Sequence, residues 1–353
     1  MELTLRSVQT AAWGGAFLGG GGGGWPIDGL SNGMLALEAG PPHLVPLDDL
    51  DPDTLVVTVS MVGAPAAAER FLRPEDFAET VTVLNERLGG RIGALIASEN
   101  GGTASLNGWF QSAVTGIPVA DAACDGRAHP TGIMGSMGLD RDESYHSVQC
   151  VVGGNPATGR RVRMVVEGAL GACDRVVRDA SMAAGGLVAV ARNPVTAAYV
   201  ADNGAPGAIT QAMGLGEILL WNRPAGGEVV ARALAEEMGG RILARGPVRD
   251  HTLRTVGGYD VGEARVGDVE LTFWNEYMTA ERGGERLATF PDLIATLDAA
   301  TGDPVVTAAL ADGLDLVVVA VPKARLILGA GVRRRESLGP AEAAVGRALA
   351  PWF

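Results

Sequence analysis

The sequence is poor in the residues that form disulfides or bind metals. Its 353 residues include three cysteines, four histidines and a single lysine, Lys323. So few cysteines in a long chain argue against a disulfide framework, and we expect a reduced, cytoplasmic protein. No His-x-His, His-x-x-x-His or Cys-x-x-Cys spacing occurs. The sequence therefore predicts no metal site and no bound cofactor.

Long apolar runs are missing too. No window reaches the roughly 18–20 uninterrupted apolar residues of a membrane span. The stretch Met1–Arg6 lacks the basic and apolar regions of a secretory signal. The formal net charge is -13, which argues against nucleic acid as a partner, because phosphate binding needs a basic surface. We expect no membrane partner, and homo-oligomerisation only on general grounds.

Hydrophobic residues make up 47% of the chain and charged residues 20%, as in well-packed globular proteins. The length predicts two domains. In the first half, helix patterns alternate with apolar strand patterns, which indicates βαβ units and a parallel sheet. The expected helices are 4–17, 26–39, 74–88 and 103–115, and the expected strands are 55–61, 91–97 and 116–120.

From about residue 145 the pattern becomes mainly strand-like. The expected elements are strands at 148–152, 161–167 and 187–191, helices at 207–220 and 227–239, a strand-rich stretch over 241–330 and a final helix at 340–350. The sequence therefore predicts an α/β fold. It consists of an N-terminal parallel-sheet domain over 1–165 and a β-rich second domain over 166–353.

The densest group of reactive side chains lies in the segment 121–132, directly after the apolar strand at 116–120. Within nine residues it holds Asp121, Cys124, Asp125, Arg127 and His129. Loops at the carboxyl ends of parallel strands are where ligands bind. An imidazole beside carboxylates can move protons near neutral pH. We therefore expect catalytic residues in this segment.

Cys124 has two interpretations. A thiolate could add to an electrophilic carbon and be displaced later by water, and Arg127 or His129 nearby would lower the thiol pKa. Alternatively, the thiol is a small buried side chain, and His129 with Asp121 or Asp125 activates water directly. Both interpretations place the chemistry in the same loop.

Six consecutive glycines, Gly19–Gly24, precede the helix that Pro26 begins. Backbone N–H groups in such a loop can bind an anionic or imide group, and Gly22 and Gly23 are the expected contacts. No strand precedes the glycines, so the run does not predict dinucleotide binding. Tight packing between neighbouring elements is the alternative role.

Glu99 and Asn100 follow the strand at 91–97 in a similar position. The side-chain amide of Asn100 can both donate to and accept from an imide edge. The planar guanidinium of Arg127 suits a substrate carboxylate. We expect these three residues to hold the substrate, with scaffolding of the loops as the alternative.

Several short motifs occur in a fixed order. They are the glycine run, Gly63-Ala64-Pro65 with Glu69, Glu99–Gly102, Asp121–Gly132, Asn275-Glu276 and Phe290–Ile294. In this ordered set the sequence resembles the S-methyl thiohydantoin desulfurase family over nearly the whole chain. The resemblance implies two domains and hydrolysis of an S-methylated thiohydantoin to a hydantoin and methanethiol, in the breakdown of ergothioneine-type compounds.

The resemblance thus implies a small heterocyclic substrate and a hydrolase acting on a carbon–sulfur bond. His129 departs from the family's pattern, since many relatives have an aromatic residue there. Ala123, which precedes Cys124, stands where many relatives have aspartate. Two other functions stay open: a metal-assisted cyclic amidohydrolase, and a non-catalytic protein that binds a small cyclic amide. The sequence assigns no role to Asn275, Glu276 or Asp292.

Overall fold

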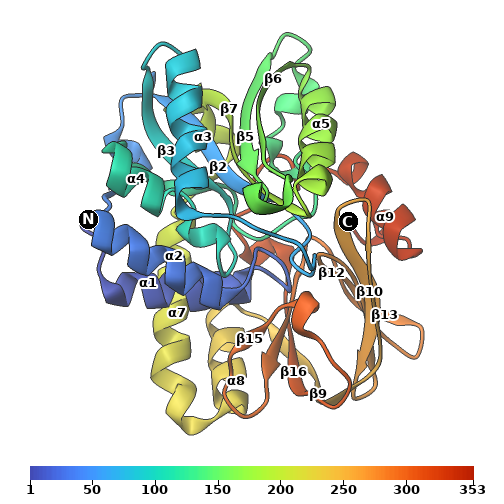
Figure 1. Ribbon diagram of the computed structural model, residues 1–353. Helices are drawn as coiled ribbons and strands as arrows, with labels where there is room; N and C mark the ends of the chain where they lie inside the picture. The colour runs from blue at the N-terminus through green and yellow to red at the C-terminus, as the bar shows by residue number, and fades with distance from the viewer.

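A computed structural model describes all residues from 1 to 353. The chain forms two lobes, each built on one sheet, with the first sheet in the upper lobe and the second in the lower lobe of Figure 1. Helices α1 (Leu5–Leu18) and α2 (Pro26–Ala39) lie along the junction between the lobes. The predicted α/β architecture with a β-rich second part is confirmed. No helix is both long and apolar enough to cross a membrane.

The first sheet has mixed strand directions. Its strands run in the order β1-β4-β3-β2-β7-β5-β6, with β8 paired to β4. Strands β1, β4, β3 and β2 are parallel, whereas β7, β5, β6 and β8 pair antiparallel. The bounds are β1 Leu44–Pro46, β2 Leu55–Gly63, β3 Ile92–Glu99, β4 Val119–Asp125, β5 Ser147–Gly153, β6 Val162–Gly168, β7 Leu187–Thr196 and β8 Ala205–Pro206.

The parallel half of this sheet agrees with the sequence prediction for β2 and β3, but β4 runs from Val119 to Asp125, so residues 121–125 belong to a strand and not to the expected loop. The helix expected at 103–115 is shorter, because a 3-10 turn at Ala104–Leu106 precedes α4 (Trp109–Thr115). The strands expected at 148–152, 161–167 and 187–191 also form, and they extend the same sheet. Residue 165 lies within β6, so the first sheet does not end at the expected domain boundary. The reason is that β5 and β7 pair along their length and bury an apolar row in which Cys150 lies opposite Ala191.

Helices cover both faces of the first sheet. Val57 and Val59 of β2 pack against α3, whereas Val62 packs with α5, as the alternation of side chains along a strand requires. Pro74 opens α3 at a position where a helix tolerates its missing N–H. The helices of this lobe are α3 Pro74–Arg87, α4 Trp109–Thr115, α5 Leu170–Ala183 and α6 Ala197–Asn203.

The second sheet is antiparallel throughout, in the order β13-β12-β11-β10-β9-β16-β14-β15. The bounds are β9 Arg241–Val256, β10 Tyr259–Val266, β11 Val269–Trp274, β12 Glu276–Arg282, β13 Glu285–Thr289, β14 Leu293–Asp298, β15 Pro304–Val305 and β16 Asp315–Val321. Helices α7 (Ala208–Asn222) and α8 (Gly227–Glu237) pack on it. The final helix, α9 (Gly339–Val345), is shorter than expected because Gly346 turns the chain with φ +64°.

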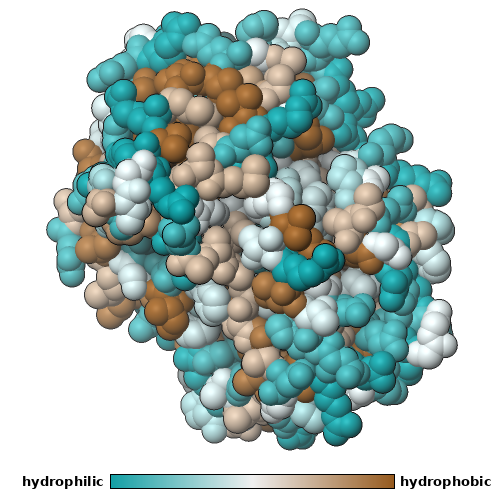
Figure 2. Space-filling model, turned by 45° about the vertical axis from the view of Figure 1, so that its right-hand side comes forward, coloured by the Kyte–Doolittle hydropathy of each residue, from teal (hydrophilic) through white to brown (hydrophobic).

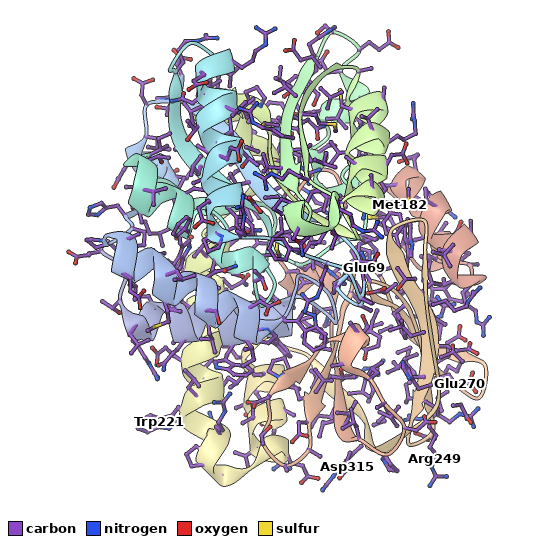
Figure 3. The ribbon with its side chains drawn as sticks, viewed as in Figure 1. Glu69, Met182, Trp221, Arg249, Glu270 and Asp315 are labelled. Carbon is purple, nitrogen blue, oxygen red and sulfur yellow. The ribbon has the colours of Figure 1, made fainter.

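The exposed surface is mixed. Brown, hydrophobic residues lie in several separate groups on the face seen in Figure 2, among teal hydrophilic ones. Trp221, at the end of α7, projects away from the lower lobe in Figure 3 and is 83% exposed.

Helix α1 belongs to the cores of both lobes. Val8 and Ala12, near its start, are buried with Val119 of β4. Phe17 and Leu18, at its end, are buried with the apolar residues of α7, α8, β14 and β16. One helix therefore fixes the lobes relative to each other, and the glycine run begins directly after it.

The glycine run passes between the two lobes and bonds to both. The carbonyl oxygens of Gly20 and Gly21 accept hydrogen bonds from the N–H groups of Tyr277 and Thr307 in the second lobe, at 2.9 and 2.8 Å. The carbonyl oxygen of Gly23 accepts from two N–H groups of the first lobe, at 3.1 and 3.0 Å. The main chain can come this close to both sides because it carries no side chains.

The contact between α1 and α7 offers a test of this packing. A Cβ atom at Gly14 would lie 1.8 Å from the carbonyl oxygen of Ala212, so the helices must separate in Gly14→Ala. We expect a loss of about 2 kcal/mol or more in the free energy of unfolding. The matched control is Gly214→Ala on α7, where a Cβ atom meets nothing within 4 Å. There we expect no loss, or a gain of up to about 1 kcal/mol. Urea unfolding of both variants checks this, and equal stabilities would contradict it.

Candidate active site

A cleft opens where the two lobes meet, at the carboxyl ends of β2 and β3. Its open space is about 770 Å³, solvent at its mouth included. The first lobe lines it with the end of β3 and the loops at 61–70 and 129–132; the glycine run adds Gly23 and Gly24, and the second lobe adds Asn275 and Glu276. Glu69, on the loop after β2, lies at this junction in Figure 3.

Glu99 is the last residue of β3, and its carboxyl group contacts His129. Its Oε2 accepts a hydrogen bond from the backbone N–H of His129 at 3.2 Å and lies 3.4 Å from His129 Nε2. The same Nε2 lies 3.4 Å from the carbonyl oxygen of Ser98, and Nδ1 has no partner. Both side chains are buried, with 14% of Glu99 and 3% of His129 exposed.

Burial decides the charge of this pair. Desolvation raises the pKa of Glu99 to about 8. Desolvation and the positive charge of Arg192 together lower the pKa of His129 to about 3. At pH 7 the contact therefore joins a largely protonated carboxyl group to a neutral imidazole. The sequence predicts that His129 moves protons near neutral pH, but a ring buried in this way stays neutral there.

Glu276 brings a second carboxyl group to the cleft from the other lobe. It is the first residue of β12, only 2% of it is exposed, and its Oε2 has no hydrogen-bond partner. A Cβ atom at Gly22 would lie 1.9 Å from Glu276 Oε1, so only glycine fits there. Burial and the nearby charge of Glu99 raise the pKa of Glu276 well above its usual range.

The residue before Glu276 holds it in place. Asn275 has φ +57°, a left-handed conformation that is uncommon for a side-chain-bearing residue. Its side-chain oxygen accepts a hydrogen bond from the N–H of Asp260 at 2.9 Å, and its own N–H donates to the carbonyl oxygen of Asp260 at 2.7 Å. These two bonds fix the turn from which Glu276 enters the cleft.

The glycine run supplies free donors to the cleft. Gly23 and Gly24 line it, and neither backbone N–H donates a hydrogen bond within the protein. A contact between the N–H of Gly23 and a ligand therefore stays a prediction. Gly22, the other expected contact, lies against Glu276 and does not line the cleft.

Cys124 does not reach the cleft. Its side chain points into the apolar core beneath the sheet, with no exposed surface, and its Sγ lies 3.1 Å from the hydroxyl of Thr58. Burial raises the pKa of the thiol to about 11, the opposite of the lowering predicted from its basic neighbours. The structure therefore favours the alternative interpretation of Cys124 as a buried side chain.

Asp121 and Asn100 also serve the scaffold. Asp121 caps α7: its Oδ1 accepts from the N–H groups of Ile209 and Thr210 at 3.0 and 3.1 Å. Asn100 is fully buried and donates to the carbonyl oxygens of Gly126 and Ala208 at 3.2 and 2.9 Å. Neither side chain lines the cleft.

Asp125 and Arg127 lie behind the cleft, at the joint of the lobes. Asp125 Oδ1 accepts from the N–H of Gly329 at 2.9 Å, Oδ2 has no partner, and burial raises its pKa to about 7. Arg127 donates to the carbonyl oxygens of Pro291 and Asp292 and lies over the ring of Phe290 at 4.5 Å. Arg127 thus clamps the second lobe, and its guanidinium does not line the cleft.

The cleft contains basic residues that the sequence analysis did not single out. These are Arg70, Arg178 and Arg192, with Trp25 beside Arg70 at 5.8 Å. The signal for Arg192 is a charged residue directly after the apolar run Leu187–Ala191 of strand β7, and a buried charge needs a partner or a function. No group of three or more His, Cys, Asp or Glu side chains is arranged to hold a metal ion.

Comparison with known proteins assigns the chain to a family. The S-Me-THD-like N-terminal domain profile matches residues 6–158, and the S-Me-THD-like C-terminal domain profile matches residues 170–341. The chain belongs to the S-Me-THD-like family. The two profiles meet between residues 158 and 170, although the first sheet continues through β7.

The fold of this S-Me-THD-like chain also occurs in a solved structure. The crystal structure of a protein from Chromobacterium violaceum superposes with a TM-score of 0.70 at 22% sequence identity, over 91% of this chain and 92% of that one. At this identity the likeness shows a shared fold. No curated protein matches the chain.

The buried carboxyl groups predict a pH-dependent stability. The folded state binds the proton of Glu99 up to about pH 8, whereas an unfolded glutamate releases it near pH 4.3. The contribution of Glu99 to the free energy of unfolding therefore falls as the pH rises from about 4 to 8. Glu99→Gln removes this penalty, so we expect it to melt a few degrees above wild type at pH 8, with little difference at pH 4.5.

The control for this stability test is Glu236→Gln on the exposed face of α8, which should melt like wild type at both pH values. Differential scanning calorimetry at the two pH values makes the comparison. A Glu99→Gln protein that melts below wild type at pH 8 would show that the carboxyl group is ionised and well solvated.

The position of Cys124 predicts tolerance to its removal. Cys124→Ala should keep the turnover of the wild-type enzyme within a few-fold, because the thiol is outside the cleft. It should lower the free energy of unfolding by about 1 kcal/mol through the lost packing. A hundredfold loss of activity with an unchanged melting temperature would restore Cys124 as a reacting group.

Proposed function

We propose that this S-Me-THD-like protein hydrolyses the carbon–sulfur bond of an S-methyl thiohydantoin and releases a hydantoin and methanethiol. The substrate class comes from the family. The observation that supports the reaction is the pair of buried carboxyl groups, Glu99 and Glu276, which the two lobes bring to one cleft beside unpaired backbone donors. We assign the chemistry to these glutamates, without a covalent thiol intermediate and without a bound cofactor.

The two carboxyl groups divide the roles of base and acid. Two buried carboxyl groups that repel each other's charge release their protons at different pH values. Glu99 has the backbone hydrogen bond from His129 to stabilise its anion, whereas Glu276 Oε2 has no partner. Glu99 therefore ionises first and acts as the base, and Glu276 keeps its proton and acts as the acid.

The reaction then proceeds by direct attack of water. Glu99 takes one proton from water as its oxygen bonds to the ring carbon that bears sulfur, and Glu276 gives its proton to the adjacent ring nitrogen. In the second step the carbon–sulfur bond breaks, the new hydroxyl returns a proton to Glu276, and Glu99 protonates the departing thiolate. One proton of water ends on nitrogen and the other on sulfur, which balances the reaction.

The surrounding groups position these steps. The neutral ring of His129 contacts Glu99 and leaves Nδ1 without a partner in the protein. The free N–H groups of Gly23 and Gly24 can stabilise negative charge that develops on the ring.

We assign the reaction to a cytoplasmic route that degrades ergothioneine-type compounds.

The test is methanethiol release from an S-methyl thiohydantoin by purified protein. Glu99→Gln and Glu276→Gln should each lower kcat by about 100-fold or more, because each removes one proton-transfer group. The control Glu236→Gln should turn over like wild type. The kcat/KM of wild type should rise with pH and level off above about pH 8, because Glu99 is half ionised at its pKa of about 8.

Other outcomes of the same assay would contradict the proposal. If wild type binds the S-methyl thiohydantoin but releases no methanethiol, the protein is a non-catalytic binding protein. Activity that appears only after addition of a divalent metal, with a ring-opened carboxylate as product, would be that of a metal-assisted cyclic amidohydrolase. Full activity of both glutamine variants would refute the assignment of base and acid.

A further inference from the structure

Three arginines line the cleft, and the protein satisfies two of them. Arg70, at the rim, pairs with Asp28 at 3.0 Å. Arg178 donates to the carbonyl oxygens of Gly258 and Pro130 at 2.9 and 3.2 Å and lies over the ring of Tyr259. Both guanidinium groups are therefore engaged in holding the walls of the cleft.

Arg192 differs from these two. Only 3% of the residue is exposed, yet it makes no hydrogen bond within the protein, and its buried Nε has no partner. Its nearest carboxylate is that of Asp174, with 3.6 Å between Nη1 and Oδ1, which is too long for a hydrogen bond. A Cβ atom at Gly132, in the loop of His129, would lie 2.9 Å from Nη1. The guanidinium thus lies under the loop that carries the site.

A buried guanidinium whose only ion pair is with a carboxylate at 3.6 Å is costly, since it presents five N–H donors and makes no hydrogen bond with them. Proteins keep such groups where a ligand supplies the acceptors. The position of Arg192 indicates which part of a ligand that is. It lines the same cleft as Glu99 and His129, and its Nη1 lies beside Gly132 in the loop that carries His129, so it lies near the reacting end of the cleft.

We propose that Arg192 binds the ring carbonyl oxygen next to the reacting carbon–nitrogen unit. This inference rests on the proposed desulfurase function. As water adds, and while the proton of Glu276 is still moving to the ring nitrogen, negative charge spreads from that nitrogen onto the carbonyl oxygen, and a fixed guanidinium stabilises it. The substrate class is thereby narrowed to S-methyl isothioureas whose nitrogen carries an acyl group, and simple S-methyl isothioureas are excluded.

The experiment uses two product-like ligands that differ in one group. Hydantoin has the carbonyl oxygen in question, and imidazolidin-2-one lacks it. Isothermal titration calorimetry should show wild type binding hydantoin at least tenfold more tightly than imidazolidin-2-one. Arg192→Gln should lose that preference by weakening hydantoin alone. The matched control is Arg175→Gln, an exposed arginine on α5, which should keep it.

Three results would overturn the inference. Arg192→Gln could weaken both ligands equally, or wild type could bind both alike. A third possibility is that the variant weakens only hydantoins that carry a side-chain carboxylate, which would place Arg192 at the substituent. Because binding is measured without turnover, the preference can hold even if wild type releases no methanethiol, and the two proposals fail separately.

Further variants test whether Arg192 only supports the structure of the cleft. Arg192→Lys keeps the charge but loses the planar pair of donors, and we expect kcat to fall at least tenfold with a smaller change in KM. Guanidinium ion should restore part of the activity of Arg192→Gly. The melting temperature of Arg192→Gln without ligand should stay close to that of wild type, because the guanidinium makes no hydrogen bond and its pair with Asp174 is 3.6 Å long. A lower melting temperature without rescue would indicate a structural residue.

Discussion

The whole site depends on a main-chain segment without side chains passing between two lobes. The glycine run accepts hydrogen bonds from Tyr277 and Thr307 on one side and from the segment at 103–104 on the other. At Gly22 the carboxyl group of Glu276 occupies the space that a Cβ atom would need. A side chain there would displace the carboxyl group of Glu276 from its place beside the glycine run. Close packing of bare backbone thus brings together two acids that are far apart in the sequence.

The same packing concentrates unsatisfied polar groups in one place. Glu276, His129 and Arg192 all have buried polar atoms without partners, and all three line the cleft. Such groups lower the stability of the folded protein, and the apolar cores of the lobes, joined by α1, offset that cost. Desolvation keeps the carboxyl group of Glu276 protonated and the imidazole of His129 neutral near pH 7, the states that the proposed proton transfers require, whereas Glu99 has to lose its proton to act as the base.

Strand and helix patterns predicted most elements of the fold, because buried strands such as β2 and β3 are continuous apolar runs. The extension of the first sheet through β7 could not be read in this way, since strand pairing depends on contacts distant in the sequence. The loop at 129–132 and Glu99 were placed correctly at the strand ends. The side chain of Cys124 points toward the core because side chains alternate along β4, which the sequence analysis did not foresee. Glu276 could not be assigned to the site from the sequence, because only the packing of the second lobe against the first brings it to the cleft.

The most direct test is an infrared titration of the carboxyl groups in wild type and in the variants Glu99→Gln and Glu276→Gln. The account predicts carboxylic-acid C=O bands that persist at pH 7 in wild type. One of them, missing in Glu99→Gln, should disappear as the pH passes about 8. The band of Glu276 should persist to higher pH. A wild-type protein whose carboxyl groups are all ionised by pH 6 would contradict the claim that the cleft holds a proton between its two lobes.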